Sequence, residues 1–246
     1  MEVRDEMQAE FSNLELNGNL SFECFVLGME NQQAFFAAKE FVEAVNVEQN
    51  VLFIHGEHGV GKTHLAHATA NLLKSIARDA KICVMSGKSF VSDVVRAYRS
   101  KSFEKFRKEY RSLDLLVIDD IDCLDNKART QEELIHILDG LHLQNTKFLA
   151  TSSFPLGEFS GFENRLLSRL HGGLAVKMGS SAELLLEIAK RRARSLGHVL
   201  EDDAALFLVK NAGSDIRHIE GALNRVVAFE KRRPLTLDLV KLALMS

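Results

Sequence analysis

The sequence predicts an α/β fold, with a five-stranded parallel sheet followed by a small all-helical domain, and three observations support this prediction. Five short apolar runs are continuous rather than alternating, which is typical of strands buried on both faces of a parallel sheet. Amphipathic helical segments separate these runs, as the crossover connections between parallel strands require. After residue 178 the strand pattern stops and only helical patterns follow.

The predicted strands are short and rich in valine, isoleucine, leucine and phenylalanine, a composition typical of buried strands. Proline interrupts helices and inner strands, and both prolines of the chain fall in predicted connections. The strands are expected at residues 51–55, 81–85, 115–118, 147–151 and 174–178.

Helices account for the rest of the chain after the last strand. Ser180 and Glu183 form a capping box that begins the first of them, and Gly197 ends it after about Leu196. The remaining helices are expected at about 203–212, from the cap Ser214 to about 231, and from the cap Thr236 onward.

Bulk composition is that of a soluble globular protein, with 46% hydrophobic and 26% charged residues. The three cysteines are scattered in apolar runs, which indicates reduced thiols in a cytoplasmic protein. No apolar run reaches the roughly 18 residues of a membrane span. The acidic N-terminus is also unlike a signal peptide. We therefore expect a cytoplasmic protein without a membrane contact.

Charge is distributed unevenly along the chain. Residues 1–48 carry ten acidic and two basic side chains, whereas residues 96–112 carry seven basic and two acidic ones. An acidic arm and a basic segment on one nearly neutral chain indicate binding partners rather than bulk solubility.

A phosphate-binding loop is predicted at residues 56–63, which fit the pattern G-x-x-x-x-G-K-[ST] between the first strand and a helix from Thr63 to about residue 76. Glycines let successive backbone N–H groups point at a phosphate, and the helix N-terminus adds partial positive charge. Lys62 is expected to reach the β- and γ-phosphates, and Thr63 to bind Mg²⁺. The expected ATP-binding residues here are Gly56, His58, Gly59, Val60, Gly61, Lys62, Thr63 and His64.

Two carboxylates, Asp119 and Asp120, follow the apolar strand at 115–118. Carboxyl ends of parallel strands are where α/β sheets present ligands. We expect Asp119 to hold Mg²⁺ through water and Asp120 to polarise an attacking water. Because aspartate is shorter than glutamate, slow ATP hydrolysis is predicted.

A zinc site is a weaker interpretation of the histidines. His64 and His67 lie three residues apart, with His55 and His58 just upstream. No thiolate or carboxylate accompanies them at metal-ligand spacing, so we do not favour zinc.

Five motifs resemble the central ATPase domain of the bacterial replication initiator DnaA, a family of the AAA+ superfamily. The resemblance spans roughly residues 20–245, nearly the whole chain. The motifs are residues 59–65, 110–121, 126–133, 163–169 and 216–226.

The resemblance implies roles for residues outside the phosphate-binding loop. Arg169 matches the arginine finger that touches ATP held by a neighbouring subunit, and Arg217 matches the sensor arginine that reads the γ-phosphate. Both guanidinium groups suit bidentate phosphate contact. Phe22, Phe25 and Val26 match the stretch that packs around the adenine, although such a run also fits an ordinary core. The implied domains are an acidic arm (1–19), a P-loop AAA+ domain (20–179) and a helical lid (180–246).

Single-stranded DNA is a further ligand that the resemblance implies, through Val95, Lys127 and Arg129. Lysine and arginine would pair with phosphates, whereas a solvated loop is the alternative for Lys127 and Arg129. The basic run 96–112 falls where initiators carry an extra helical insertion. Its aromatic residues fit the buried face of an amphipathic helix, and they are Tyr98, Phe103, Phe106 and Tyr110.

Two departures from the family pattern limit the resemblance. Ser153 stands where the family carries an aspartate after Thr-Ser, which predicts weaker nucleotide binding, although its hydroxyl can still reach a phosphate. The sequence also stops where the lid should end, so sequence-specific binding of duplex DNA is not expected. This layout resembles Hda, a short homologue of the initiator.

We therefore expect an ATP-binding protein that acts in initiation of chromosomal replication or its regulation. Its expected partners are the initiator or further copies of itself, together with single-stranded DNA. A helicase-loader or transposition-helper ATPase is the main alternative and predicts a helicase or transposase partner instead. A small-molecule P-loop kinase leaves Arg217 and the C-terminal helices unexplained.

Overall fold

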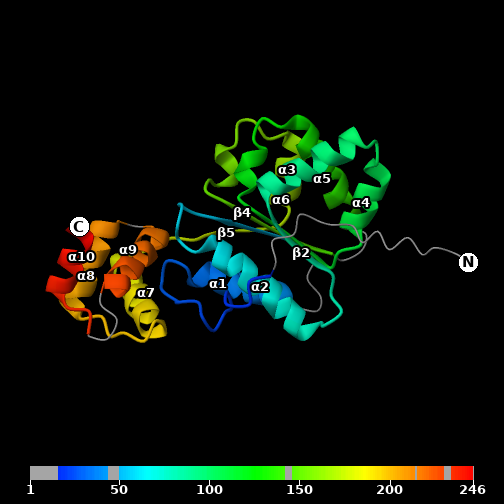
Figure 1. Ribbon diagram of the computed structural model, residues 1–246. Helices are drawn as coiled ribbons and strands as arrows, with labels where there is room; N and C mark the ends of the chain where they lie inside the picture. Colours follow the sequence, from blue (N-terminus) through cyan, green and yellow to red (C-terminus); the bar gives the residue numbers. More distant parts are fainter. Residues whose placement is uncertain (1–15, 44–49, 142–145, 214, 230–233, 246) are drawn as a thin grey trace, which may run out of the picture.

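The computed structural model describes residues 16–43, 50–141, 146–213, 215–229 and 234–245. It confirms the predicted sheet, in which five parallel strands lie in the order β2-β3-β4-β1-β5 (Figure 1). Each strand differs from its predicted bounds by at most one residue at either end. The strands are β1 (Val51–His55), β2 (Ile82–Ser86), β3 (Leu115–Asp119), β4 (Lys147–Ser152) and β5 (Leu174–Lys177).

Helices cover both faces of the sheet, which explains why the inner strands are apolar throughout. One face packs against α1 (Gln32–Glu43) and α2 (Lys62–Ile76), and α3 to α6 lie on the other (Figure 1). Side chains therefore alternate between two separate hydrophobic clusters, so that Phe53 belongs to one and Leu52 to the other. The helices of the second face are α3 (Gly87–Arg99), α4 (Phe103–Arg111), α5 (Ala128–Leu141) and α6 (Asn164–His171).

The strand order decides which loops meet. Strand β4 lies between β3 and β1, and all three run parallel, so their carboxyl ends share one edge of the sheet. That edge brings together Asp119, Ser152 and the residues after His55, which come from three distant parts of the chain. Two short 3-10 turns, Ile121–Leu124 and Leu156–Glu158, follow β3 and β4 at the same edge.

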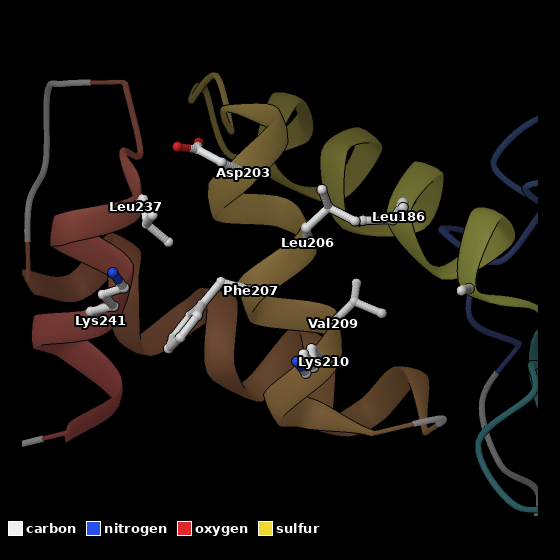
Figure 2. A pocket seen from close by; sticks show the side chains of 9 residues that line it. Leu186, Asp203, Leu206, Phe207, Val209, Lys210, Leu237 and Lys241 are labelled. Carbon is white, nitrogen blue, oxygen red and sulfur yellow. The ribbon is translucent and has the colours of Figure 1, made fainter.

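The four C-terminal helices enclose a third hydrophobic cluster, which among the described residues is built from residues after 184. Between α7, α8 and α10 an apolar groove is open to solvent, with Leu206, Phe207 and Lys241 among its lining residues (Figure 2). Among the described residues, no helix has the length and apolar character needed to cross a bilayer. The helices are α7 (Ala182–Ser195), α8 (Asp202–Ala212), α9 (Ile216–Phe229) and α10 (Leu237–Met245).

Two predicted helix caps need correction or lie outside the described residues. The cap of α7 is Ser181 and not Ser180, because the Ser181 hydroxyl accepts the Leu184 N–H at 3.2 Å. For α9, Asp215 fills the capping position, since its Oδ1 accepts the Arg217 N–H at 2.8 Å. Ser214 and residues 230–231 lie outside the described part of the chain.

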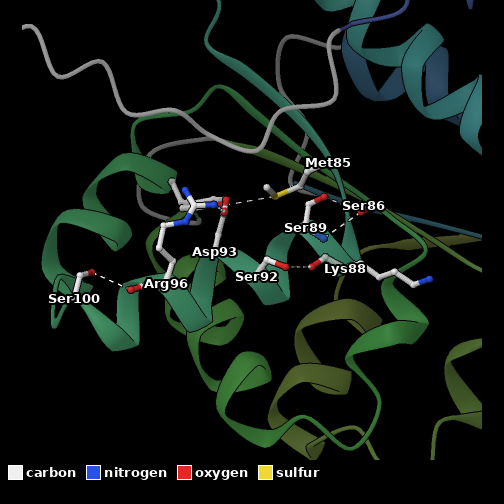
Figure 3. A network of polar contacts seen from close by, with 9 residues as sticks. Met85, Ser86, Lys88, Ser89, Ser92, Asp93, Arg96 and Ser100 are labelled. Atoms are coloured by element: carbon white, nitrogen blue, oxygen red, sulfur yellow. Dashed lines mark hydrogen bonds and ion pairs between the residues drawn. The ribbon is translucent and has the colours of Figure 1, made fainter.

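The basic segment 96–112 forms the end of α3 and the whole of α4. Phe106 and Tyr110 are buried, as expected for the apolar face of a helix, but Tyr98 is 51% exposed and contradicts that interpretation. The Tyr110 hydroxyl donates to the buried Asp93 at 2.9 Å, and Arg96 donates to the same carboxylate at 2.7 Å (Figure 3). This network fixes α3 and α4 to each other.

Candidate nucleotide site

The loop at residues 56–63 connects β1 to α2 and has the conformation that phosphate binding needs. Gly59 and Gly61 have φ angles of 73° and 101°, values that residues with a side chain rarely adopt. Gly61 immediately precedes α2, which begins at Lys62, one residue earlier than predicted. A Cβ atom at Gly56 would lie 1.9 Å from the Met178 carbonyl oxygen. Glycine is therefore required at each of these three positions.

Lys62 is held inside the loop. Its side chain is nearly buried, and Nζ donates to the carbonyl oxygens of Gly56 at 2.7 Å and Glu57 at 2.8 Å. Burial lowers the pKa of Lys62, whereas the nearby carboxylates of Asp120 and Asp122 raise it. A buried ammonium group with only neutral carbonyl partners would gain from an anion in the loop.

Asp119 is fixed by two threonine hydroxyl groups. Thr63 at the start of α2 donates to Oδ2 at 2.7 Å, and Thr151 of β4 donates to Oδ1 at 2.5 Å. The Thr151 oxygen in turn accepts the backbone N–H of Asp120 at 3.0 Å. Thr63 and Asp119 therefore meet as predicted, although they are 56 positions apart.

Asp120 lies beside this pair in an uncommon backbone conformation. Its φ of 55° and ψ of 57° place a residue with a side chain in the left-handed region. Such conformations cost free energy and persist where the surroundings enforce them, often at functional sites. Burial and the neighbouring Asp119 raise the pKa of Asp120, as expected for a group that accepts a proton.

The donor set suits a hard cation. The Thr63 hydroxyl and the Asp119 carboxylate are oxygen ligands of the kind Mg²⁺ prefers, and they already lie within hydrogen-bond distance. The histidines make other contacts: His64 Nε2 lies 2.9 Å from the Ser21 carbonyl oxygen, and His67 Nδ1 accepts the Asn17 N–H at 3.5 Å. Throughout the described residues, no three His, Cys, Asp or Glu side chains gather into a metal-binding group.

Ser153 lies at the same edge of the sheet as the phosphate-binding loop. Its hydroxyl is 3.3 Å from His58 Nδ1 in the loop, so the structure brings these two predicted residues together. Its backbone N–H points at both carboxylate oxygens of Asp122, at 3.2 and 3.3 Å. An acidic side chain is thus present beside Ser153, contributed by the turn after β3.

The segment before α1 packs against the phosphate-binding loop and its helix. Phe25 is buried, its ring lies 5.2 Å from the His64 ring, and a Cβ atom at Gly61 would contact it at 3.8 Å. Phe22 and Phe25 both pack against Phe35, at 5.1 and 5.6 Å between ring centroids. Of the predicted adenine-pocket residues, Phe25 therefore adjoins the loop, Phe22 packs against Phe35, and Val26 follows Phe25 directly.

The lid contacts the site at two places. The N–H of Ile216 donates to the Gly59 carbonyl oxygen at 3.0 Å, which joins the start of α9 to the phosphate-binding loop. Arg191 of α7 donates to the carbonyl oxygen of Phe25 at 3.3 Å and also to that of Glu23. Arg217 directly follows Ile216, and its guanidinium forms an ion pair with Asp215 at 2.7 Å.

Arg169 is not part of this edge. It lies on α6, across the sheet from α2 (Figure 1), and its Nε donates to Asp139 of α5 at 2.7 Å. Arg165, one turn earlier, approaches the same carboxylate at 3.7 Å. The side chain of Arg169 is 46% exposed, so it can reach a second molecule.

The three predicted DNA contacts lie on α3 and at the start of α5. The Arg129 guanidinium lies 4.9 Å from the ring centroid of Tyr98. Tyr98 follows Val95 by about one turn of α3. Val95 and Tyr98 are 43% and 51% exposed. Lys127 lies just before α5, where its ammonium group donates to the Cys123 carbonyl oxygen. Tyr98 joins this surface although the sequence predicted a buried position.

Four residues that contact predicted functional residues or the segment before α1 were not predicted from the sequence. Asp122 and Asp215 each lie within two residues of a predicted site residue, so proximity in sequence is a usable signal for both. Asp139 is 30 positions from its partner Arg169, and Arg191 is 166 positions from its partner, the Phe25 carbonyl. Only the folded chain brings these partners into contact.

Comparison with known proteins is consistent with this geometry. The sequence profile of the bacterial DnaA ATPase domain matches residues 16–177. The chain is 38% identical over 242 residues to the chromosomal replication initiator protein DnaA of Paraburkholderia phymatum. That alignment covers 97% of this chain and 47% of the relative, so the chain spans less than half of the relative's length.

Two solved structures share the fold over most of the chain. Domain III of the Thermotoga maritima replication initiation protein DnaA matches with a TM-score of 0.87 and 28% identity, covering 94% of this chain and 98% of that one. A replication initiator DnaA bound to AMPPCP and single-stranded DNA matches with a TM-score of 0.81 and 29% identity, covering 89% of this chain and 67% of that one.

Proposed function

The chain belongs to the bacterial DnaA ATPase-domain family, and on that basis we propose that it binds ATP and acts in initiation of chromosomal DNA replication or its regulation. The observation that carries this proposal is the glycine loop around Lys62 with Thr63 and Asp119 in direct contact beside it. This combination of a backbone cradle, an ammonium group and two oxygen ligands fits a magnesium-bound triphosphate.

Thr63 and Asp119 would hold the magnesium ion. When bound there, Mg²⁺ would neutralise negative charge on the β- and γ-phosphates. Lys62 would turn from the carbonyl oxygens of the loop toward the phosphates, where it gains charged partners. Phe22, Phe25 and Val26 would enclose the adenine, since Phe25 already packs against Gly61.

We further propose slow hydrolysis of the bound ATP. Asp120 is next to Asp119 in the turn after β3, where its carboxylate would orient the attacking water. Ser153 and His58 lie at the same edge and would hydrogen-bond the terminal phosphate or the attacking water. The carboxylate of Asp120 reaches less far than a glutamate would, which is consistent with a slow reaction.

The assembly proposal rests on the two arginines. Arg217, in the helical lid over residues 180–246, would read the γ-phosphate of ATP bound by the P-loop domain over residues 20–179. Arg169 would contact ATP bound by a neighbouring subunit, either the initiator or a second copy of this chain. The separate hydrophobic cluster of the lid supports the division into two domains, and the ion pair at Asp139 keeps Arg169 at the surface. Such assembly would take place in the cytoplasm.

Single-stranded DNA would bind at Val95, Lys127 and Arg129. The related initiator in complex with AMPPCP and single-stranded DNA motivates this proposal. The exposed pair of Tyr98 and Arg129 supports it, because an aromatic ring and a guanidinium group both stack on bases.

Calorimetry with ATP and Mg²⁺ tests the central proposal. The native chain should bind, and Lys62→Ala should weaken ATP binding about 100-fold, because several charge-assisted hydrogen bonds are lost. Lys74→Ala, on the same helix but directed at the Ala80 carbonyl oxygen, serves as the matched control and should leave binding unchanged. Equal affinities for the native and Lys62→Ala proteins would refute the proposal.

A further inference from the structure

Asp215 links the lid, the phosphate-binding loop and Arg217. It precedes α9 and caps that helix, because its Oδ1 accepts the Arg217 N–H at 2.8 Å. Its side chain is 17% exposed, whereas that of its partner Arg217 is 67% exposed. The carboxylate is therefore the fixed member of the pair, and the guanidinium is the member that can move.

The pair has strong hydrogen-bond geometry. Arg217 Nη2 donates to Oδ2 at 2.7 Å, and Nε lies 3.1 and 3.2 Å from the two carboxylate oxygens. These bonds lower the pKa of Asp215 and raise that of Arg217, so both groups are charged at neutral pH. In this ion pair the N–H groups of the guanidinium donate to the carboxylate. The same N–H groups would donate to a phosphate.

The carboxylate also lies directly against the phosphate-binding loop. A Cβ atom at Gly59 would be 1.9 Å from Asp215 Oδ1, and the next residue, Ile216, donates its N–H to the Gly59 carbonyl oxygen at 3.0 Å. A negative charge is thus fixed on the lid at the loop expected to hold phosphates.

We propose that Asp215 is a positioning residue that holds Arg217 on the lid until a triphosphate takes its place, and so limits the preference of the site for ATP over ADP. The inference rests on the proposed ATP site and on Arg217 as the residue that reads the γ-phosphate. ATP gains the contact with Arg217 only by breaking the ion pair. ADP has no γ-phosphate and leaves the pair intact, so Asp215 weakens ATP binding more than ADP binding.

The variant Asp215→Asn isolates the charge, because asparagine caps helices as well as aspartate does. We expect the ratio of dissociation constants, Kd for ADP over Kd for ATP, to rise about threefold to fivefold, the range for a well-formed ion pair at a surface. The measurement is equilibrium titration of the full chain with each nucleotide in Mg²⁺ at constant ionic strength. A general loss of structure would change both constants together and leave the ratio unmoved.

Two further variants separate this role from a general effect of charge. Glu220→Gln removes the same charge from the same helix, where Glu220 pairs with Arg192 at 3.7 Å, and should change the ratio less than about twofold. In an Arg217→Ala background, Asp215→Asn should also change it less than about twofold.

The inference would be overturned if Asp215→Asn left the ratio of Kd for ADP to Kd for ATP unchanged. It would also be overturned if Glu220→Gln, or Asp215→Asn in the Arg217→Ala background, raised the ratio equally. Either result would leave the ATP site in place. Absence of nucleotide binding in the native chain would instead refute the proposed function, and this inference with it.

Discussion

Arg169 and Arg217 have the same expected ligand, the terminal phosphate of ATP, but they are held in different ways. Asp215 is two positions from Arg217, caps the same helix and is largely buried. Asp139 comes from another helix, 30 positions from Arg169, and both members of that pair are partly exposed.

This difference suits Arg217 to a contact within its own chain and Arg169 to a contact with another molecule. The Arg217 pair lies against Gly59, so it can respond to the nucleotide of its own chain. The Arg169 pair lies on α6 and α5, across the sheet from the phosphate-binding helix, so it can respond only to another molecule (Figure 1). Two arginines of similar chemistry should therefore control two separable steps, nucleotide binding and assembly.

The largest expected effect comes from Arg169→Ala. Because an arginine finger stabilises transition-state charge, the ATP hydrolysis that assembly stimulates should fall about 1000-fold. The affinity of the isolated chain for ATP should change less than about twofold. The measurements are phosphate release at high protein concentration, or with ATP-loaded initiator, and calorimetry of the dilute chain.

The control for Arg169→Ala is Arg165→Ala, which removes a guanidinium from the same helix and the same carboxylate at the longer distance of 3.7 Å. It should retain the stimulated rate. A weaker affinity of isolated Arg169→Ala for ATP would break the comparison, because it would make Arg169 an internal contact as well.

Arg217→Ala should have the next largest effect, and it should act on nucleotide binding rather than on assembly. Loss of a charge-assisted contact with the γ-phosphate should weaken ATP binding about tenfold and ADP binding less than about twofold. Titration with both nucleotides measures this. Arg225→Ala, further along the exposed side of α9, is the matched control. Equal weakening of ATP and ADP would show that Arg217 does not read the γ-phosphate.

The smallest effect is expected for Asp139→Asn, which sharpens the comparison. Release of Arg169 from its partner should tighten ATP-dependent self-association about threefold, the scale of a partly exposed ion pair. Sedimentation in ATP and in ADP measures the association constant. Glu132→Gln removes the same charge from the same helix and should have no effect. Weaker association would mean that Asp139 positions Arg169 rather than restrains it.

The sheet could be predicted from the sequence because each strand is buried on both faces. Continuous apolar runs such as 51–55 and 115–118 encode that burial directly, and their bounds were correct to within one residue. The conformation of the loop at residues 56–63 could be predicted equally well, because its backbone angles require glycine at positions 59 and 61. Signals of this kind are contained within a few consecutive residues.

The parts that the sequence did not predict depend on contacts between distant segments. No periodic pattern relates Arg191 to the Phe25 carbonyl oxygen or Asp139 to Arg169. Tyr98 was assigned to one buried helix face together with Phe106 and Tyr110, yet it belongs to a separate helix, α3, and its ring contacts Arg129. The cap at Ser181 was missed by one residue because two serines are adjacent, and both suit a helix start.

The lid touches the site at two places that lie along the expected length of a nucleotide. Ile216 binds the loop that would surround the phosphates, and Arg191 binds the backbone of the segment that would enclose the base. Because both contacts come from the helical domain, movement of that domain away from the sheet would break both of them. Release of a bound nucleotide should therefore be coupled to movement of the helical domain.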